Sequence, residues 1–259
     1  MGYFKNIYNS RYVLMSLVER DIVSKYRRSI LGVAWTLITP LCMVGVIGIV
    51  YSVVFGTPLV DFIPFLFSGL TPWFFITACA ESGAMAYIVA EGFITQTRTE
   101  IDIFPLRIVL VGFVNYGFML LAYFIVYALL RPDAFSLRML LTIPASLILF
   151  IFGVGFTNIV AIINLYIRDY AYIQSIALQC LFYITPIIYS IDMMKQRGFD
   201  VIYLYNPLHY LIDIIRQSML GAVPAALSSW LIAGGIALGT FISSLILLKC
   251  VGRKIVFKF

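Results

Sequence analysis

Residues 25–41 of the chain read KYRRSILGVAWTLITPL, a cluster of cations followed at once by an apolar run. Similar apolar runs recur along the 259 residues, and each has about the 20-residue length of a helix that crosses a bilayer. Apolar residues make up 62% of the chain and charged residues 12%, whereas soluble domains contain roughly 45–50% and 25%. The sequence therefore predicts an all-α integral membrane protein in which residues 25–41 lead into the first span.

The apolar runs predict six transmembrane helices and hence both termini on the same side of the membrane. The expected spans are residues 32–56, 63–86, 107–130, 138–166, 172–191 and 228–249. On the side of the termini lie Lys5, Arg11, Arg20, Lys25, Arg27, Arg28, Arg98, Arg107, Arg168, Lys249, Arg253, Lys254 and Lys258. The remaining cations are Arg131, Arg138, Lys195, Arg197 and Arg216. Because basic loops stay in the cytoplasm, both termini are expected there.

The chain is expected to form one transmembrane domain, residues 1–259, without catalytic chemistry of its own. It contains no G-x-x-x-x-G-K-[ST] sequence for binding ATP, and no H-E-x-x-H or G-x-S-x-G motif. The four cysteines show no spacing typical of a disulfide framework or a zinc site, so no metal is expected. The net charge of +6 resides at span ends and does not indicate nucleic-acid binding.

Residues 1–30 predict an amphipathic helix in the membrane interface. The apolar residues at helical spacing are Ile7, Leu14, Leu17, Val18, Ile22 and Tyr26, and the cations on the remaining surface are Arg11, Arg20, Lys25 and Arg28. Such a helix is attracted to anionic headgroups. It could serve as a topology anchor, as a docking collar for a cytoplasmic partner, or as both.

The loop over residues 87–106 mixes acidic, basic and apolar side chains. Pro105 is expected to stop any helix before the third span, and Thr97 or Thr99 is expected to cap a short helix within the loop. Apolar surface is expected from Ile94, Ile101, Ile103 and Phe104. A solvated hairpin and a short helix that inserts into a cleft of another protein both fit this composition.

Residues 192–227 predict short re-entrant or interfacial helices on the outer side, between spans five and six. Asn206 is a candidate N-cap, Pro207 suits the first helical position, and Gly221 ends the helix. About 15 residues rise only ~22 Å, too little for a bilayer core of ~30 Å. His209, Asp213 and Arg216 are expected on a polar face, which favours a surface role over a ligand role for His209, the chain's only histidine.

Aromatic residues gather toward the outer ends of spans one, two and five. The candidates are Tyr51, Phe55, Trp73, Phe74, Tyr183 and Tyr189. They could form an interfacial belt, or they could line a path and offer apolar ring faces to the C–H surfaces of sugars. Glu81 is the clearest acid inside a span, and its position near the span end gives little support for a proton relay.

Five segments in collinear order resemble the membrane (permease) subunit of polysaccharide ABC exporters of the O-antigen type. They are RDIVSKYRRSILGVAWTLITP (20–40), FLFSGLTPWFF (65–75), NLYIRDY (164–170), YITPIIYS (183–190) and YNPLHYLIDIIR (205–216). The resemblance covers almost the whole chain and extends to related capsule and teichoic acid exporters. A drug or lipid exporter of the same superfamily and a membrane-embedded enzyme acting on polyprenyl-linked sugars remain alternatives.

The resemblance implies a homodimer in the bacterial inner membrane with two copies of a cytoplasmic ATPase, which would carry ATP and Mg²⁺. Its cargo would be undecaprenyl-diphosphate-linked O-antigen polysaccharide. It implies ATPase coupling through Arg98, Glu100 and Asp102, and a second contact at Arg168 and Asp169. It implies headgroup entry at Lys25, Arg27 and Arg28, a channel beside the six aromatic residues, and a periplasmic gate that includes His209, Asp213 and Arg216.

Overall fold

The computed structural model describes residues 2–26, 34–97, 99–196, 198–252 and 255. Over these residues the regular structure is entirely helical. The helices are α1 (Tyr3–Asn9), α2 (Arg11–Tyr26), α3 (Trp35–Phe55), α4 (Leu59–Ala84), α5 (Ala86–Val89), α6 (Glu91–Gln96), α7 (Ile103–Leu130), η2 (Pro132–Ala134), η3 (Leu137–Leu141), α8 (Thr142–Tyr166), α9 (Tyr170–Ile184), α10 (Ile191–Gln196), α11 (Asp200–Leu204), α12 (Pro207–Leu220) and α13 (Leu227–Val251).

Five helical stretches of the described chain are long and apolar enough to cross a membrane. They are Leu37–Phe55, Leu59–Ala84, Ile103–Leu130, Leu137–Tyr166 and Leu227–Val251. They fall on five of the predicted spans, so the all-helical membrane fold is confirmed while the count of six spanning helices is not.

The predicted span over residues 172–191 corresponds to α9, which is shorter than a membrane-spanning helix. The helix ends at Ile184, and the next residue, Thr185, is extended with ψ 134°. Thr185 precedes Pro186, whose ring disfavours helical backbone in the preceding residue. A proline five residues before the end of the predicted span therefore interrupts it, which hydropathy alone did not indicate.

Helices α4 and α8 form the centre of the bundle. In their most apolar stretches 67% and 61% of the residues are buried, against 22% in α3 and 17% in α13. Close packing of α13 on α8 depends on Gly155, because a Cβ there would lie 2.6 Å from the backbone nitrogen of Phe241. The peripheral helices α3 and α13 thus leave most of their apolar surface for lipid or for another chain.

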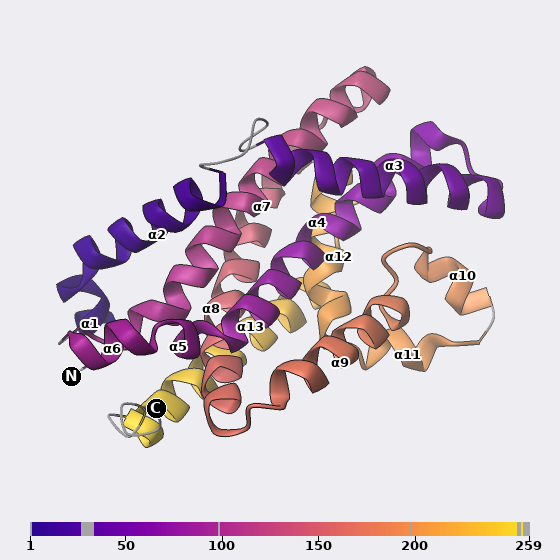
Figure 1. The fold of residues 1–259 in the computed structure, drawn as a ribbon. Helices are drawn as coiled ribbons and strands as arrows, with labels where there is room; N and C mark the ends of the chain where they lie inside the picture. The colour runs from indigo at the N-terminus through magenta and orange to yellow at the C-terminus, as the bar shows by residue number, and fades with distance from the viewer. Residues whose placement is uncertain (1, 27–33, 98, 197, 253–254, 256–259) are drawn as a thin grey trace.

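Both chain ends lie at the same end of the bundle (Figure 1). We call this the terminal end; it also holds α1, α5 and α6, whereas α10 and α11 lie toward the opposite, distal end. The two ends therefore lie on the same side, as expected from six predicted spans, although only five spanning helices are found among the described residues.

The loop before α7 differs from the expectation in two respects. Helix α7 begins at Ile103, so Pro105 sits in its first turn rather than ahead of it; a proline is tolerated there because its position needs no N–H donor. The short helix of the loop is α6, and Thr97 closes this helix instead of capping a new one, with its hydroxyl donating to the carbonyl of Phe93 at 2.8 Å.

Candidate functional site

The N-terminal helices present apolar side chains on two sides. Leu14, Leu17 and Val18 of α2 are buried, and α2 packs along α7. On the outer surface Tyr8 and Tyr12 remain 66% and 74% exposed. The guanidinium of Arg11 lies 4.4 Å from the centroid of each of these two rings. The buried side is the one predicted from the apolar spacing, and the outer surface carries exposed aromatic rings in addition to the predicted cations Arg11 and Arg20.

Two long-range polar contacts fasten these helices to the start of α7. Nδ2 of Asn6 donates to Oδ2 of Asp102 at 2.7 Å. Oδ2 of Asp21 lies 2.9 Å from Nε of Arg107, whose side chain is 8% exposed. We call these contacts the two terminal pins, because each joins the N-terminal segment to the loop or helix that follows residue 98.

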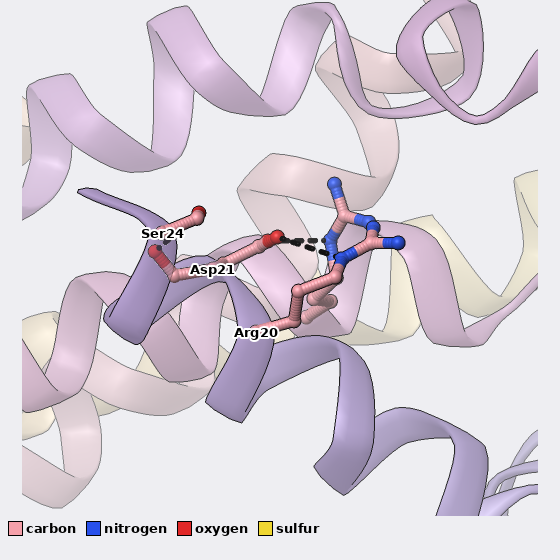
Figure 2. A network of polar contacts seen from close by, with 4 residues as sticks. Arg20, Asp21 and Ser24 are labelled. Atoms are coloured by element: carbon pink, nitrogen blue, oxygen red, sulfur yellow. Dashed lines mark hydrogen bonds and ion pairs between the residues drawn. The ribbon is translucent and has the colours of Figure 1, made fainter. Parts of the chain in front are cut away.

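The surroundings of Asp21 are drawn in Figure 2. Oδ1 of Asp21 lies 4.0 Å from Nε of Arg20, and the Ser24 hydroxyl donates to the Asp21 backbone carbonyl at 3.3 Å. Arg20 is 63% exposed while Arg107 is buried, so the inner of the two cations depends on Asp21 far more than the outer one does.

Asp102 belongs to a buried polar cluster at the terminal end. The cluster comprises Tyr3, Asn6, Tyr87, Asp102 and Asn158, and Asn158 is fully buried. Burial raises the pKa of Asp102, an effect that the hydrogen bond from Asn6 opposes. Burial likewise raises the pKa of Tyr3 to about 12.

The candidate coupling residues are thus unequally accessible. Asp102 is only 7% exposed, so it is not the surface contact expected from the sequence. Glu100 is half-buried, and Arg98 lies outside the described residues. Arg168 and Asp169 are exposed in the turn between α8 and α9.

Sequence reasoning missed the residue that holds this second turn. Nδ2 of Asn164 donates to the carbonyl of Ala84 at 2.8 Å, and its Oδ1 accepts from the backbone nitrogen of Ala171 at 3.1 Å. One amide therefore joins the ends of α4 and α8 to the start of α9. The signal available in the sequence was a polar side chain inside an otherwise apolar run.

The candidate headgroup cations are Lys25, Arg27 and Arg28. Lys25 is the penultimate residue of α2, and Arg27 and Arg28 lie outside the described residues. Entry of a diphosphate beside them stays a prediction.

The six candidate channel aromatics lie around two hollows. The distal hollow, about 260 Å³, is lined by Phe55 and Tyr189, and Tyr51 packs on Phe55 with ring centroids 5.5 Å apart. The other, about 350 Å³, lies between α3, α4 and α9 and is called the central hollow. It is lined by Met43, Leu70, Trp73, Phe74, Thr77, Glu81, Ser175, Leu178, Gln179, Phe182 and Tyr183.

The rings around the central hollow differ in accessibility. Trp73 is 5% exposed and packs on Phe182 with centroids 5.5 Å apart, whereas Tyr183 is 62% exposed. Phe74 is half-buried. The accessible ring surface in the hollow therefore comes mainly from Phe74, Phe182 and Tyr183. The buried Trp73 packs against Phe182.

The candidate gate helix α12 has the predicted boundaries. Oδ1 of Asn206 accepts from the backbone nitrogen of Leu208 at 3.0 Å, and Gly221 ends the helix with φ 67°. The predicted polar face is wrong, however, because His209 and Arg216 are 6% and 4% exposed. Asp213 is half-buried.

His209 is enclosed by aromatic rings. Its ring centroid lies 5.3 Å from that of Tyr203 and 5.1 Å from that of Tyr210. Burial lowers the pKa of His209, and the nearby Asp213 opposes this shift. The environment is that of a packed neutral imidazole within the folded chain.

Arg216 binds the broken end of α9. Its Nη1 donates to the carbonyl of Pro186 at 2.6 Å and its Nη2 to that of Ile187 at 2.8 Å. The guanidinium also lies 4.2 Å from the ring centroid of Phe65. A Cβ at Gly69 would collide with this guanidinium, so α4 leaves room for it. We call this arrangement the distal pin.

Further hydrogen bonds hold both ends of α12. The hydroxyl of Tyr123 donates to the carbonyl of Met219 at 3.1 Å, and that of Tyr127 to the carbonyl of Leu220 at 3.2 Å. Nδ2 of Asn206 donates to Oγ1 of Thr185 at 2.8 Å. Helix α12 is thereby tied to α7 and to the segment after α9.

Sequence comparison connects this architecture to a known family. The profile described as ABC-2 type transporter matches residues 12–220, which include the terminal pin at Asp21, both hollows and the whole of α12. The chain belongs to the ABC-2 type transporter family. The family resemblance predicted from the five sequence segments is therefore confirmed, and the protein is a multi-pass membrane permease rather than an enzyme.

Curated relatives carry a more specific description. The chain is 26% identical over 222 residues to the O-antigen export system permease protein RfbA of Klebsiella pneumoniae, covering 83% of this chain and 84% of the relative. It is 27% identical over 194 residues to the protein of that name from Myxococcus xanthus, covering 75% and 74%. A second Klebsiella pneumoniae RfbA is 27% identical over 211 residues.

Proposed function

We propose that this chain is the permease subunit of an ATP-driven exporter that moves undecaprenyl-diphosphate-linked O-antigen polysaccharide across the bacterial inner membrane. The observation that carries the proposal is its similarity to RfbA proteins over 75–83% of the chain. In this arrangement the terminal end faces the cytoplasm and the distal end faces the periplasm, as the excess of cations near the termini favours.

The ATPase is proposed to be a separate chain, with two copies bound to a dimer of this permease. ATP and Mg²⁺ would reside on those copies, since this sequence has no phosphate-binding loop. The exposed apolar surface of α3 supports pairing of two copies: Val50, Val53 and Val54 are 51%, 80% and 67% exposed.

Coupling is proposed to enter at α6 and the turn at Arg168 and Asp169. Force on the segment that contains Arg98 and Glu100 would pass through the two terminal pins to α1, α2 and α7. In this role Asp102 transmits movement from inside the protein and does not contact the ATPase.

Cargo is proposed to enter beside Lys25, Arg27 and Arg28, because guanidinium groups pair well with diphosphate oxygens. The glycan would then pass the central and distal hollows. Helix α12, with His209, Asp213 and Arg216, would form part of the periplasmic gate.

Deletion of the gene tests this function. Cells that lack the chain are expected to lose surface O-antigen while lipid-linked O-antigen accumulates inside, and a plasmid copy is expected to restore export. Unchanged surface O-antigen would contradict the proposal. Loss of capsule or of teichoic acid instead would reassign the cargo to that polymer.

A further inference from the structure

The central hollow has a polar half and an aromatic half. Helices α4 and α9 contact each other and run in opposite directions, so Glu81 lies near the level of Ser175, and Trp73 lies near the level of Phe182. Eight residues separate Trp73 from Glu81, which corresponds to about 12 Å along a helix. The hollow is therefore an elongated groove with polar groups toward the terminal end and rings toward the distal end.

The polar groups in this groove are free to meet a ligand. Glu81, Ser175 and Gln179 are exposed, and none of the three has a hydrogen bond or ion pair with another described residue. Ser175 and Gln179 lie within the apolar helix α9. Polar side chains at membrane depth are unfavourable against lipid and normally face protein or a water-filled path.

The groove has an acidic side chain but no basic side chain among its described lining residues. Its only ionisable groups among the described lining residues are the Glu81 carboxyl and the Tyr183 phenol, and no Lys, Arg or His is among them. A carboxylate or phosphate on a ligand would meet Glu81 without a compensating cation among the described lining residues, and like charges at close range repel each other. Hydroxyl groups, in contrast, can donate to Glu81 and Gln179.

From this groove we infer that the exported glycan is an uncharged, hydroxyl-rich chain and that Glu81 selects against acidic polymers. Sugar rings would pack their C–H surfaces on Phe74, Phe182 and Tyr183 and direct their hydroxyls to Glu81, Ser175 and Gln179. This inference rests on the proposed export function and narrows it, because capsules and teichoic acids whose repeating units carry carboxylates or phosphates do not fit the groove.

Binding to the full-length permease in nanodiscs tests the inference without transport. The substitutions Trp35→Phe and Trp230→Phe leave Trp73, at the back of the groove, as the only tryptophan. The probes are maltoheptaose, which is neutral, and a heptameric oligogalacturonate, which carries a carboxylate on every ring. Trp73 fluorescence is titrated with each probe at low ionic strength.

The expected result is saturable binding of maltoheptaose and roughly tenfold weaker binding of the acidic probe. Glu81→Gln should remove most of that difference while changing maltoheptaose affinity little, and Glu81→Lys should reverse the preference. The control is Asp133→Asn, which removes an exposed acid of η2 outside the groove and should preserve the native ratio.

Equal affinities of the native protein for the two probes would overturn the inference. So would an unchanged ratio of the two affinities in Glu81→Gln. The absence of a saturable response to either probe, as expected if lipid fills the groove, would also overturn it. These results are independent of the gene-deletion experiment. Unchanged surface O-antigen in the deletion strain would refute the export function, whereas the binding ratios report on Glu81 alone.

Discussion

The terminal and distal ends of the bundle are fastened by different chemistry. At the terminal end, side chains pair with side chains: Asn6 with Asp102 and Asp21 with Arg107. At the distal end, the buried guanidinium of Arg216 donates to two backbone carbonyls. Side-chain pairs can exchange partners with water or another protein, whereas carbonyls at a helix break have few other donors. The contacts at the terminal end can therefore rearrange more readily than the distal pin.

The largest effect is expected for Arg216→Gln. The substitution leaves the buried carbonyls of Pro186 and Ile187 without their donors, and each unpaired group costs about 1–3 kcal/mol. The free energy of unfolding should therefore fall by about 2–5 kcal/mol in detergent, as measured by thermal or denaturant unfolding.

The matched control is Arg131→Gln, which removes another distal arginine. Arg131 pairs with Asp61, but the two side chains are 44% and 48% exposed. Exposed pairs contribute only about 0–1 kcal/mol. Equal losses in the two variants would contradict the distinction between a buried pin and a surface ion pair.

Gly69→Ala tests the distal pin without removing its donor. The added methyl group collides with the guanidinium of Arg216, so the pin must shift from the carbonyls of Pro186 and Ile187. Overpacking of this kind typically costs about 1–3 kcal/mol. Gly45→Ala is the control, because a Cβ there meets no atom within 4 Å; comparable melting temperatures for the two variants would argue against the close approach.

Asp21→Asn is expected to loosen the terminal end by a smaller amount. The substitution removes the charge opposite the buried Arg107, and we expect a loss of about 1–2 kcal/mol in the free energy of unfolding because Asn can still accept a hydrogen bond. Faster hydrogen exchange at the start of α7 should report it. Arg20→Gln, which alters only the exposed partner of Asp21, should leave exchange there unchanged.

The smallest effect is expected for Asp102→Asn, and it depends on pH. Because burial raises the pKa of Asp102 in the folded chain, its contribution to stability is present below the unfolded-state pKa and is lost as pH rises through the folded-state value. In the native protein the melting temperature should fall as pH rises above about 4, and Asp102→Asn should reduce that fall. The exposed control Asp133→Asn should keep the native profile; a native profile in Asp102→Asn would contradict the role assigned to burial.

The sequence predicted parts of the candidate site whose signals are local. The caps at Asn206 and Gly221 follow from neighbouring residues, and they appear as predicted. The six aromatics lie around two hollows, with Trp73 and Phe74 in the middle of α4 and not at the end of a span, and their role as a channel lining stays a prediction. The prediction that His209 and Arg216 lie on an exposed polar face was wrong. Periodicity indicates which residues share a helix face, but it does not indicate whether another helix covers that face.

Composition by itself determined the helical membrane fold, because a bilayer imposes span length on any sequence, and the five collinear segments indicated the family that the profile match confirmed. The tertiary structure alone decided that Asp102 and Arg216 are buried and that Glu81 stands in an aromatic groove. Those positions depend on partners 29 to 96 residues away in the sequence, such as Asn6 for Asp102 and Ile187 for Arg216. Packing of distant segments, which no local pattern encodes, therefore determines which polar residues form buried contacts and which stay on the surface.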